Sequence, residues 1–385
     1  MPIHLYAEHL LNIHTLTIQA SLDSDSNEST RAVLDPADKL LTLTHKGECN
    51  SIPLPVNDPL QSETDGLRPL ELLSSPSKDL TFRVRLESAS PLRCNGGPIG
   101  ADVRNVLPWT AGQLGKSTKL SCSTCSATII ARDHVETWKD LPSETWAEMM
   151  DFWHCHKPDP PEDQNHCDVV NKGYTAASRL ELSRGIGLVD TTAFLFTADQ
   201  CEQIVETSLD DEDPALLCSS CNAPLGHIDA PTGGHRLDKS ALSLSSSPQH
   251  PSVSYSRDKW LTLHLLAAVE NQGVRRFSLS ARDSTLKLWL FTPDLLVSSS
   301  ALPCAAPLRV AKILWRRENT LAATASSTLE SEAPAEAELS LTRHAAGELA
   351  RSLERSAHWL PLAARSFHGW RVGLLERFAG GHAGQ

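Results

Sequence analysis

The chain has 385 residues, 40% of them hydrophobic and 21% charged, and a formal net charge of −12 at pH 7. This composition indicates a globular protein with room for two domains or one large elaborated domain. The negative charge argues against a general nucleic-acid binder, which needs a basic face, and no apolar run reaches the length of a membrane span. No secretory signal precedes the ten cysteines, so we expect reduced thiols and a cytoplasmic or nuclear protein.

The N-terminal part of the chain is predicted to be an antiparallel sheet. Apolar and polar residues alternate with a period of two in HTLTIQASL, LTLTHKG and LTFRVRLES, and polar stretches separate these segments. We therefore expect residues 1–110 to form a β-rich domain with polar loops.

Two Cys-x-x-Cys pairs follow at a distance of 92 intervening residues, in SCSTCSAT and LCSSCNAPLG. Four thiolates are a ligand set of tetrahedral structural zinc, and the small or turn-forming residues after each pair suit a tight loop around a metal. The alternatives are a redox dithiol, which usually stands alone at a helix start, and four buried or idle cysteines. We predict one structural Zn²⁺, closed to water, whose ligands are Cys122, Cys125, Cys218 and Cys221.

A helix is predicted between the two pairs, from Ser143 to about His154. Its apolar face follows the spacing i, i+3, i+4 and i+7, with Trp146, Met149, Met150 and Trp153. Core packing explains this face better than partner binding. The proline-rich, acidic stretch KPDPPEDQNH then ends the helix.

Further strands and helices are predicted in the second half of the chain. LVDTTAFLF is expected to be a strand, and the Gly185-Ile186-Gly187 sequence before it does not open a helix, so it forms no phosphate loop. A helix is expected from about Ser256 to Gln272, followed by strands in RRFSLSA, TLKLWLF and RVAKILWRR, and a last helix in ELARSLERSAHWL. No internal repeat is evident.

These patterns predict an α+β, β-rich protein, with antiparallel sheets and a few helices joined by the zinc site. The expected divisions are the N-terminal domain at 1–110, a central zinc-knuckle region at 111–230, a linker at 231–252, an α/β segment at 253–318, a flexible acidic loop at 319–341 and a C-terminal segment at 342–385.

Four stretches together resemble one known family. They are LPSETWAEMMDFWHCHK at 141–157, RGIGLVDTTAFLF at 184–196, CSSCNAPLG at 218–226 and LPLAARSFHGWRVGLLERF at 360–378. The chain resembles the HECT-like ubiquitin ligases, also called ubiquitin-conjugating-enzyme (E2)-binding proteins, and is most similar to fungal members. The resemblance extends over most of the chain beyond residue 100.

The resemblance implies a HECT-like E3 ubiquitin-protein ligase. Such a protein binds a ubiquitin-conjugating enzyme and promotes the transfer of ubiquitin to substrate proteins, and its C-terminal segment is compared with part of a HECT domain. The family is also linked to the machinery that cleaves and polyadenylates pre-mRNA. The alternative function is therefore a non-enzymatic binding protein or assembly chaperone for an mRNA 3′-end processing factor. No direct nucleic-acid or membrane partner is expected.

One departure from the family pattern concerns the nucleophile. A HECT ligase carries ubiquitin as a thioester on a cysteine near its C-terminus, but the last cysteine here is Cys304. Serine forms an ester of different stability and needs stronger activation. The C-terminal segment therefore cannot be a self-sufficient catalytic lobe. Either another cysteine accepts ubiquitin, or the protein binds the charged conjugating enzyme without a covalent intermediate.

Cys155 is the candidate catalytic cysteine. It lies between His154 and His156, whose imidazolium forms would lower the pKa of its thiol, although the dipole of a preceding helix C-terminus opposes a thiolate. Cys167 and Cys201 are weaker candidates. A second metal site that includes Cys155 is an open alternative, with the cluster His154, Cys155, His156, His166 and Cys167.

The closing segment combines aromatic residues with arginines. Its aromatic residues are Trp359, Phe367, Trp370 and Phe378, and the arginines between them are Arg365, Arg371 and Arg377. The structural interpretation is an element that docks on the sheet with solvated arginines. The functional interpretation is an anchor for a protein partner, since aromatic residues and arginine dominate interface energetics. The sequence contains no Gly-x-Ser-x-Gly motif and no phosphate loop, so we do not expect a hydrolase or a dehydrogenase.

Overall fold

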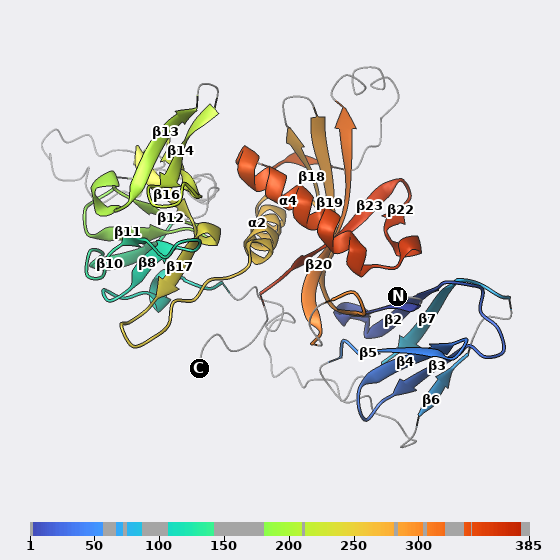
Figure 1. Ribbon diagram of the computed structural model, residues 1–385. Helices are drawn as coiled ribbons and strands as arrows, with labels where there is room; N and C mark the ends of the chain where they lie inside the picture. The colour runs from blue at the N-terminus through green and yellow to red at the C-terminus, as the bar shows by residue number, and fades with distance from the viewer. Residues whose placement is uncertain are drawn as a thin grey trace, which may run out of the picture. The chain divides into compact units, whose positions relative to one another are not determined.

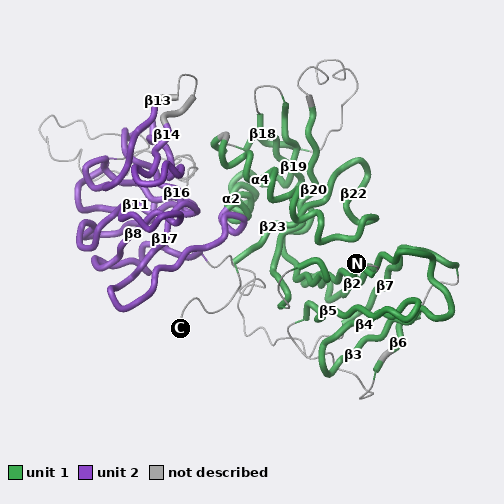
Figure 2. Tube along the Cα trace, in the orientation of Figure 1, with its two compact units in different colours: residues 1–106, 261–385 green, residues 107–260 purple. Residues whose placement is uncertain are grey.

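The computed structural model describes residues 3–56, 67–71, 75–86, 107–141, 181–209, 212–280, 284–302, 306–319, 335–339 and 341–378. The chain divides into two units (Figure 2). The first unit consists of Met1–Val106 and Leu261–Gln385, and the second consists of Leu107–Trp260. The first unit is therefore built from both ends of the chain.

The first unit contains a nine-stranded sheet in which the N-terminal and C-terminal parts of the chain pair (Figure 1). Its main path is β22-β23-β20-β19-β1-β2-β7, while β18 pairs with β19 and β21. The strands are β1 (Ile3–Leu10), β2 (Thr15–Leu22), β7 (Asp79–Arg85), β18 (Arg276–Ser280), β19 (Ser284–Ser299), β20 (Leu308–Asn319), β21 (Ala337–Glu338), β22 (Ser366–Phe367) and β23 (Trp370–Glu376). Antiparallel pairing of β1 with β19 makes the N-terminal strands part of this larger sheet.

A four-stranded antiparallel sheet lies next to the N-terminal strands, in the order β5-β4-β3-β6. Its strands are β3 (Arg31–Asp35), β4 (Leu40–His45), β5 (Glu48–Pro53) and β6 (Arg68–Leu70). Apolar side chains from β1 and β2 form one buried cluster with those of this sheet, among them Leu5, Ile18, Leu41 and Leu43. The three strands predicted in this region are confirmed as β2, β4 and β7, because alternation with a period of two marks a sheet with one buried face.

Two α-helices occur among the described residues, α2 (Arg257–Gln272) and α4 (Arg343–Ser356), and both were predicted. Their apolar side chains pack on one face of the nine-stranded sheet, in a cluster that includes Leu265, Leu349, Leu353, Ile313 and Trp315. The hydroxyl of Thr342 accepts a hydrogen bond from the N–H of Ala345 and so caps the start of α4. Neither helix is both long and apolar enough to cross a membrane.

The close contact between α4 and β23 depends on a glycine. A Cβ atom at Gly373 would lie 2.7 Å from Leu353 Cδ2 and 3.0 Å from Leu353 Cα. Such distances are shorter than van der Waals contact, so only glycine lets the helix backbone come this near to the strand.

The closing segment docks on the sheet, as the structural interpretation proposed. Leu360, Val372 and Leu374 are buried together with Leu314 on the face opposite to α2 and α4. The expectation of solvated arginines is wrong for Arg377, which is 5% exposed. Its guanidinium donates to the carbonyl of Pro293 and lies 3.3 Å from the Asp294 carboxylate. Arg377 follows β23 beside Arg309 at the start of β20, and its side chain reaches across β20 to the bulge of β19 between Thr292 and Leu295.

The second unit contains a seven-stranded and a three-stranded sheet, with the orders β10-β11-β12-β16-β15-β14-β13 and β17-β8-β9. The strands are β8 (Lys119–Cys122), β9 (Thr128–Ile130), β10 (Thr137–Asp140), β11 (Ile186–Val189), β12 (Ala193–Phe196), β13 (Ile204–Leu209), β14 (Glu212–Cys218), β15 (Pro224–Asp229), β16 (Gly234–Asp238) and β17 (Leu242–Ser245). All pairs are antiparallel except β10 with β11. The strand predicted over LVDTTAFLF is a hairpin of β11 and β12, because Asp190–Thr192 form a turn.

The structure differs from the linker expected at residues 231–252. This segment holds β16, the 3-10 helix η4 (Lys239–Ala241) and β17, and all four residues of β17 are buried. Serines alternate with leucines in β17, and their hydroxyls are satisfied locally, as when Ser245 Oγ donates to the Ser247 carbonyl at 2.9 Å. Composition alone therefore mistook a buried, serine-rich strand for a linker.

Several predictions lie outside the described residues. These are the helix at 143–154, the catalytic candidate Cys155, the second metal cluster with His154, His156, His166 and Cys167, and most of the acidic loop. They remain predictions. The described end of that loop contains β21, which pairs in parallel with β18, and the buried Leu339.

Candidate metal centre

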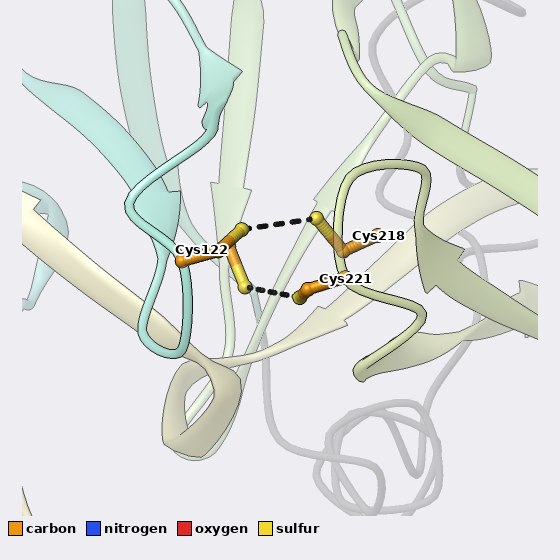
Figure 3. A group of neighbouring side chains, drawn as sticks. Cys122, Cys218 and Cys221 are labelled. Carbon is orange, nitrogen blue, oxygen red and sulfur yellow. Dashed lines mark hydrogen bonds between the residues drawn. The ribbon is translucent and has the colours of Figure 1, made fainter.

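The two Cys-x-x-Cys pairs meet at one point in the second unit (Figure 3). Cys122 Sγ lies 3.7 Å from Cys221 Sγ, and Cys125 Sγ lies 3.6 Å from Cys218 Sγ. All four sulfurs lie within 4.8 Å of one another. The prediction that the distant pairs converge is confirmed.

The sulfur–sulfur distances are those of a metal site. Four sulfurs placed tetrahedrally at ~2.3 Å from a zinc ion lie about 3.8 Å from one another. A disulfide would need sulfurs at about 2.05 Å, and the four cysteines are free thiols. The cluster can therefore hold one ion with four thiolates, and this ligand set leaves no open coordination position for water or substrate.

Each pair is held by the same local backbone structure. In the first pair, the N–H of Cys122 donates to the carbonyl of Ala127 at 2.8 Å, and the N–H of Ser126 donates to the carbonyl of Cys122 at 2.9 Å. Ser126 has a φ of 63°, so the chain turns sharply just after the second cysteine. This turn aims the N–H of Ala127 at the sulfur of Cys125, as expected for a metal-binding knuckle.

The second pair repeats this structure residue by residue. The N–H of Cys218 donates to the carbonyl of Ala223 at 2.9 Å, and the N–H of Asn222 donates to the carbonyl of Cys218 at 2.8 Å. Asn222 has a φ of 56°. Asn and Ser tolerate this left-handed conformation better than branched residues do, which explains why they follow the second cysteine of each pair.

The repeat extends to the 3-10 turn before each knuckle, η2 (Ala111–Gln113) and η3 (Ala198–Gln200). Both turns begin with a capping box, formed by Thr110 with Gln113 and by Thr197 with Gln200. The two capping boxes appear in the sequence as TAGQ and TADQ. Their distances to the following cysteine pair differ: Thr110 lies 12 positions before Cys122 (122 − 110), whereas Thr197 lies 21 positions before Cys218 (218 − 197). The two segments therefore share local backbone structure without a fixed spacing in the sequence.

The thiols of the cluster differ in acidity when no metal charge acts on them. Burial acts to raise the pKa of Cys218, but the N–H groups of Ser220 and Cys221 and the neighbouring thiols outweigh it and hold this pKa at about 7. For Cys221, the N–H of Ala223 acts to lower the pKa, but burial and the three neighbouring thiols raise it to about 12. Crowded thiolates repel one another, and a bound dication would remove that repulsion.

A buried lysine, for which the sequence carries no signal, lies on the chain segment that leads to the cluster. Lys239 is 1% exposed, and its ammonium donates to the carbonyls of Trp109 at 3.1 Å and Thr191 at 3.4 Å. The ammonium also lies 5.0 Å from the centre of the Phe194 ring, within cation–π range. Burial lowers the pKa of Lys239 to about 8. Three residues later, Leu242 pairs with Cys122, so η4 positions the strand next to the first knuckle.

Cys201, a weaker catalytic candidate, is half-buried at the end of η3. Burial, with the charge of Asp199, raises the pKa of its thiol to about 12. Such a thiol stays protonated at neutral pH and is a poor nucleophile. Cys155 and Cys167 lie outside the described residues, so the structure does not place the catalytic candidate relative to the metal cluster.

Two relatives are found in fungi. An uncharacterized protein of Saccharomyces cerevisiae is 29% identical over 239 residues, which are 60% of this chain and 65% of the relative. An uncharacterized protein of Schizosaccharomyces pombe is 26% identical over 322 residues, which are 80% of this chain and 89% of the relative. The match thus spans just under two thirds of the Saccharomyces cerevisiae protein. No solved structure matches the chain.

Residues 8–372 match the family described as HECT-like ubiquitin-conjugating enzyme (E2)-binding. The match covers nearly the whole chain and includes both cysteine pairs and residues 360–372 of the closing segment. The chain therefore belongs to the HECT-like ubiquitin-conjugating enzyme (E2)-binding family.

Proposed function

We propose that this protein binds a ubiquitin-conjugating enzyme and promotes the transfer of ubiquitin to protein substrates. The observation that carries the proposal is the family match over residues 8–372, which spans parts of both units. A ubiquitin-conjugating enzyme, ubiquitin and a protein substrate are the partners in this proposal. We place the activity in the cytoplasm or nucleus, because four free thiolates persist in a reducing compartment.

The metal centre has a structural role in this proposal. Cys122, Cys125, Cys218 and Cys221 hold one Zn²⁺, and four thiolates exclude water from the ion. The ion joins the hairpin of β8 and β9 to the hairpin of β14 and β15, whose knuckles are separated by 92 residues of the second unit's sequence. The metal therefore stabilises a surface for other proteins and takes part in no chemical step.

The described cysteines favour transfer without a covalent intermediate on this protein. Four of the six belong to the metal cluster, and the thiol of Cys201 has a pKa of about 12. Cys49 is exposed on β5, but no described imidazole lies within hydrogen-bond distance of it to activate its thiol. The remaining thioester candidates are Cys155 and, as the weaker one, Cys167. We propose that the protein binds the charged conjugating enzyme and orients its thioester, unless one of these two cysteines accepts ubiquitin.

The test is an in vitro assay with activating enzyme, conjugating enzymes and ubiquitin. The proposal expects ubiquitin chains that depend on this protein, together with binding of the conjugating enzyme. A ubiquitin adduct that is sensitive to reducing agent and absent in Cys155→Ala identifies a covalent route. Chains without such an adduct identify an orienting scaffold, and Cys49→Ala serves as the matched cysteine control.

A negative result in this assay, together with binding of a processing factor, would support the alternative function. If no conjugating enzyme binds and no chains form, while a purified mRNA 3′-end processing factor binds tightly, the protein is a binding protein or assembly chaperone. The Cys218→Ser variant tests the metal's role in the same assays. If the metal is structural, this variant should lose its structure together with whichever activity the unaltered protein shows, ubiquitin-chain formation or binding of the processing factor.

A further inference from the structure

An exposed aromatic cluster lies on the nine-stranded sheet of the first unit. Trp289 and Phe291 come from β19, Phe367 from β22 and Trp370 from β23. Successive ring centres lie 6.2 Å apart from Trp370 to Trp289, 5.2 Å from Trp289 to Phe291 and 5.8 Å from Phe291 to Phe367. These four residues form the aromatic face.

The aromatic face is on the side of the sheet away from α2 and α4. Trp289 and Trp370 pack against the buried cluster around Leu314 and Val372, whereas the alternate residues of the same strands face the helices. The two tryptophans are half-buried, but Phe291 is 40% exposed and Phe367 is 44% exposed. Apolar rings gathered in one exposed patch mark a binding surface more often than a scattered exposed residue does.

Two irregularities of the backbone present these phenylalanines to solvent. The register of β19 with β20 shifts between Leu290 and Thr292, so Phe291 is the extra residue of a β-bulge. Phe367 pairs with Trp370 across a two-residue turn, in which His368 and Gly369 both have positive φ. Bulges re-aim side chains, and a turn of this type holds a hairpin tightly. Both rings are therefore held in place by the fold.

Two arginines flank the aromatic face in fixed positions. The guanidinium carbon of Arg276 lies 4.4 Å from the centre of the Trp289 ring, and that of Arg316 lies 4.6 Å from the Trp370 ring. Among the described residues, no carboxylate lies within 4.0 Å of Arg276, while Arg316 pairs with Glu318 at 2.6 Å in an exposed position. An exposed ion pair contributes little, so a partner carboxylate can replace Glu318.

We infer that the aromatic face binds a protein segment in which apolar side chains are flanked by carboxylates. The apolar side chains contact Phe291 and Phe367, and the carboxylates pair with Arg276 and Arg316. Arginines stacked on aromatic rings are pre-ordered donors for carboxylates, and aromatic residues with arginine are the residue types that dominate binding energy. This interaction goes beyond the proposed function and does not depend on ubiquitin transfer.

The same geometry disfavours single-stranded nucleic acid as the occupant. Bases stack on free ring faces, but a guanidinium already covers one face of each tryptophan. The net charge of −12 repels a phosphate backbone, with a charge at every nucleotide, more strongly than a short segment whose two carboxylates Arg276 and Arg316 can pair.

The test begins with a random dodecapeptide library displayed on phage and selected on the full chain. Peptides that also bind the double variant Phe291→Ser, Phe367→Ser are removed by counter-selection. The proposal expects enriched peptides with Leu, Ile or Phe between Asp or Glu residues. It is overturned if no peptide survives counter-selection, or if the survivors are basic or lack charge.

The best peptide is then synthesised with a fluorescent label, and its affinity is measured by anisotropy. We expect at least about tenfold weaker binding to the double phenylalanine variant and to the double variant Arg276→Gln, Arg316→Gln. The matched control is Val205→Ser, an exposed apolar position in the second unit, which leaves the affinity unchanged. Thermal melts verify that each variant is folded.

A measurement on the unaltered protein keeps the result independent of folding. The same peptide with a photo-crosslinker should attach within β19, β22 or β23, as located by mass spectrometry. Crosslinks confined to other strands overturn the proposal. It is also overturned if an oligouridylate probe binds through Phe291 and Phe367 while the peptide does not, or if the double phenylalanine variant abolishes self-association of the chain.

Discussion

Cys122 Sγ and Cys221 Sγ lie 3.7 Å apart, although 99 positions separate the two residues in the chain. The contact joins the knuckle after β8 to the knuckle after β14, and each knuckle has the same turn and hydrogen bonds. Two matching knuckles that face each other satisfy the geometry of a tetrahedral ion, so this pair of residues links local backbone structure to the long-range organisation of the second unit.

We expect one zinc ion per chain in the purified protein, measured by inductively coupled plasma mass spectrometry. Cys218→Ser should lose the metal, because three thiolates and a hydroxyl bind zinc far more weakly than four thiolates. A strong chelator should lower the melting temperature, since metal binding supplies folding free energy. Cys49→Ser, on β5 in the first unit, should keep both metal and melting temperature. A metal-free protein with an unchanged melting temperature would contradict this role.

Alkylation should distinguish the described cysteines by their environment. In native protein at pH 8, iodoacetamide should modify the exposed Cys49 rapidly and Cys201 slowly, because the pKa of Cys201 is about 12 and only the thiolate reacts. The four cluster cysteines should react only after the chelator is added. Peptide mass spectrometry with time points measures each rate, and equal rates for Cys49 and Cys201 would disprove the prediction.

The buried Lys239 should make stability depend on alkaline pH. The pKa of Lys239 is about 8 in the folded protein and has its ordinary value of 10.5 in the unfolded chain, so the unfolded state binds more protons between these values. The free energy of unfolding of the second unit should therefore rise as pH increases from about 8 to 10, by up to about 3 kcal/mol. Below pH 8 the folded protein buries the charged ammonium of Lys239, so the additional free energy of unfolding is absent.

The matched variant for this prediction is Lys239→Met, which keeps an unbranched apolar chain but has no ionisable group. Urea unfolding at pH 8 and pH 10 should show a smaller increase for the variant than for the unaltered protein. The window avoids Asp238, whose pKa burial raises only to about 6. Equal pH dependence in the two proteins would rule out Lys239 as its source.

A pair of glycines tests the contact between α4 and β23. Gly373→Ala should destabilise the first unit by about 1–3 kcal/mol, since its Cβ would lie 2.7 Å from Leu353 Cδ2. Gly347→Ala, within α4, should stabilise it by up to about 1 kcal/mol, because the nearest atom to its Cβ is 3.9 Å away and alanine favours helix. Calorimetric melts compare them, and a stabilising Gly373→Ala would contradict the packing argument.

Many elements of the fold could be predicted from local patterns. Alternating apolar residues marked β2, β4 and β7, and the helical spacing of apolar residues marked α2 and α4. The pattern failed for β17, where leucines alternate with serines and both faces are buried. It also merged β11 and β12, because a three-residue turn between two apolar strands leaves a nearly continuous apolar run.

The candidate site shows the same division. The chemistry of the ligands was evident from the cysteine spacing, and the structure confirms that the pairs converge. Lys239 carried no signal, since a single lysine in a polar stretch is normally solvated. The repeated capping boxes were visible as TAGQ and TADQ, but their unequal distance from the cysteines concealed them until the backbone showed equal turns.

The sequence by itself determined the residue types that can bind a metal, the periodicity of most strands and both described helices, and the family. These properties depend on composition, spacing and short-range backbone preferences. Only the tertiary structure decided that β1 pairs with β19, that Cys122 meets Cys221, and that four aromatic rings from three strands gather on one face. Strand pairing joins residues far apart in the chain, and its register depends on how whole elements pack, which no local window of sequence contains.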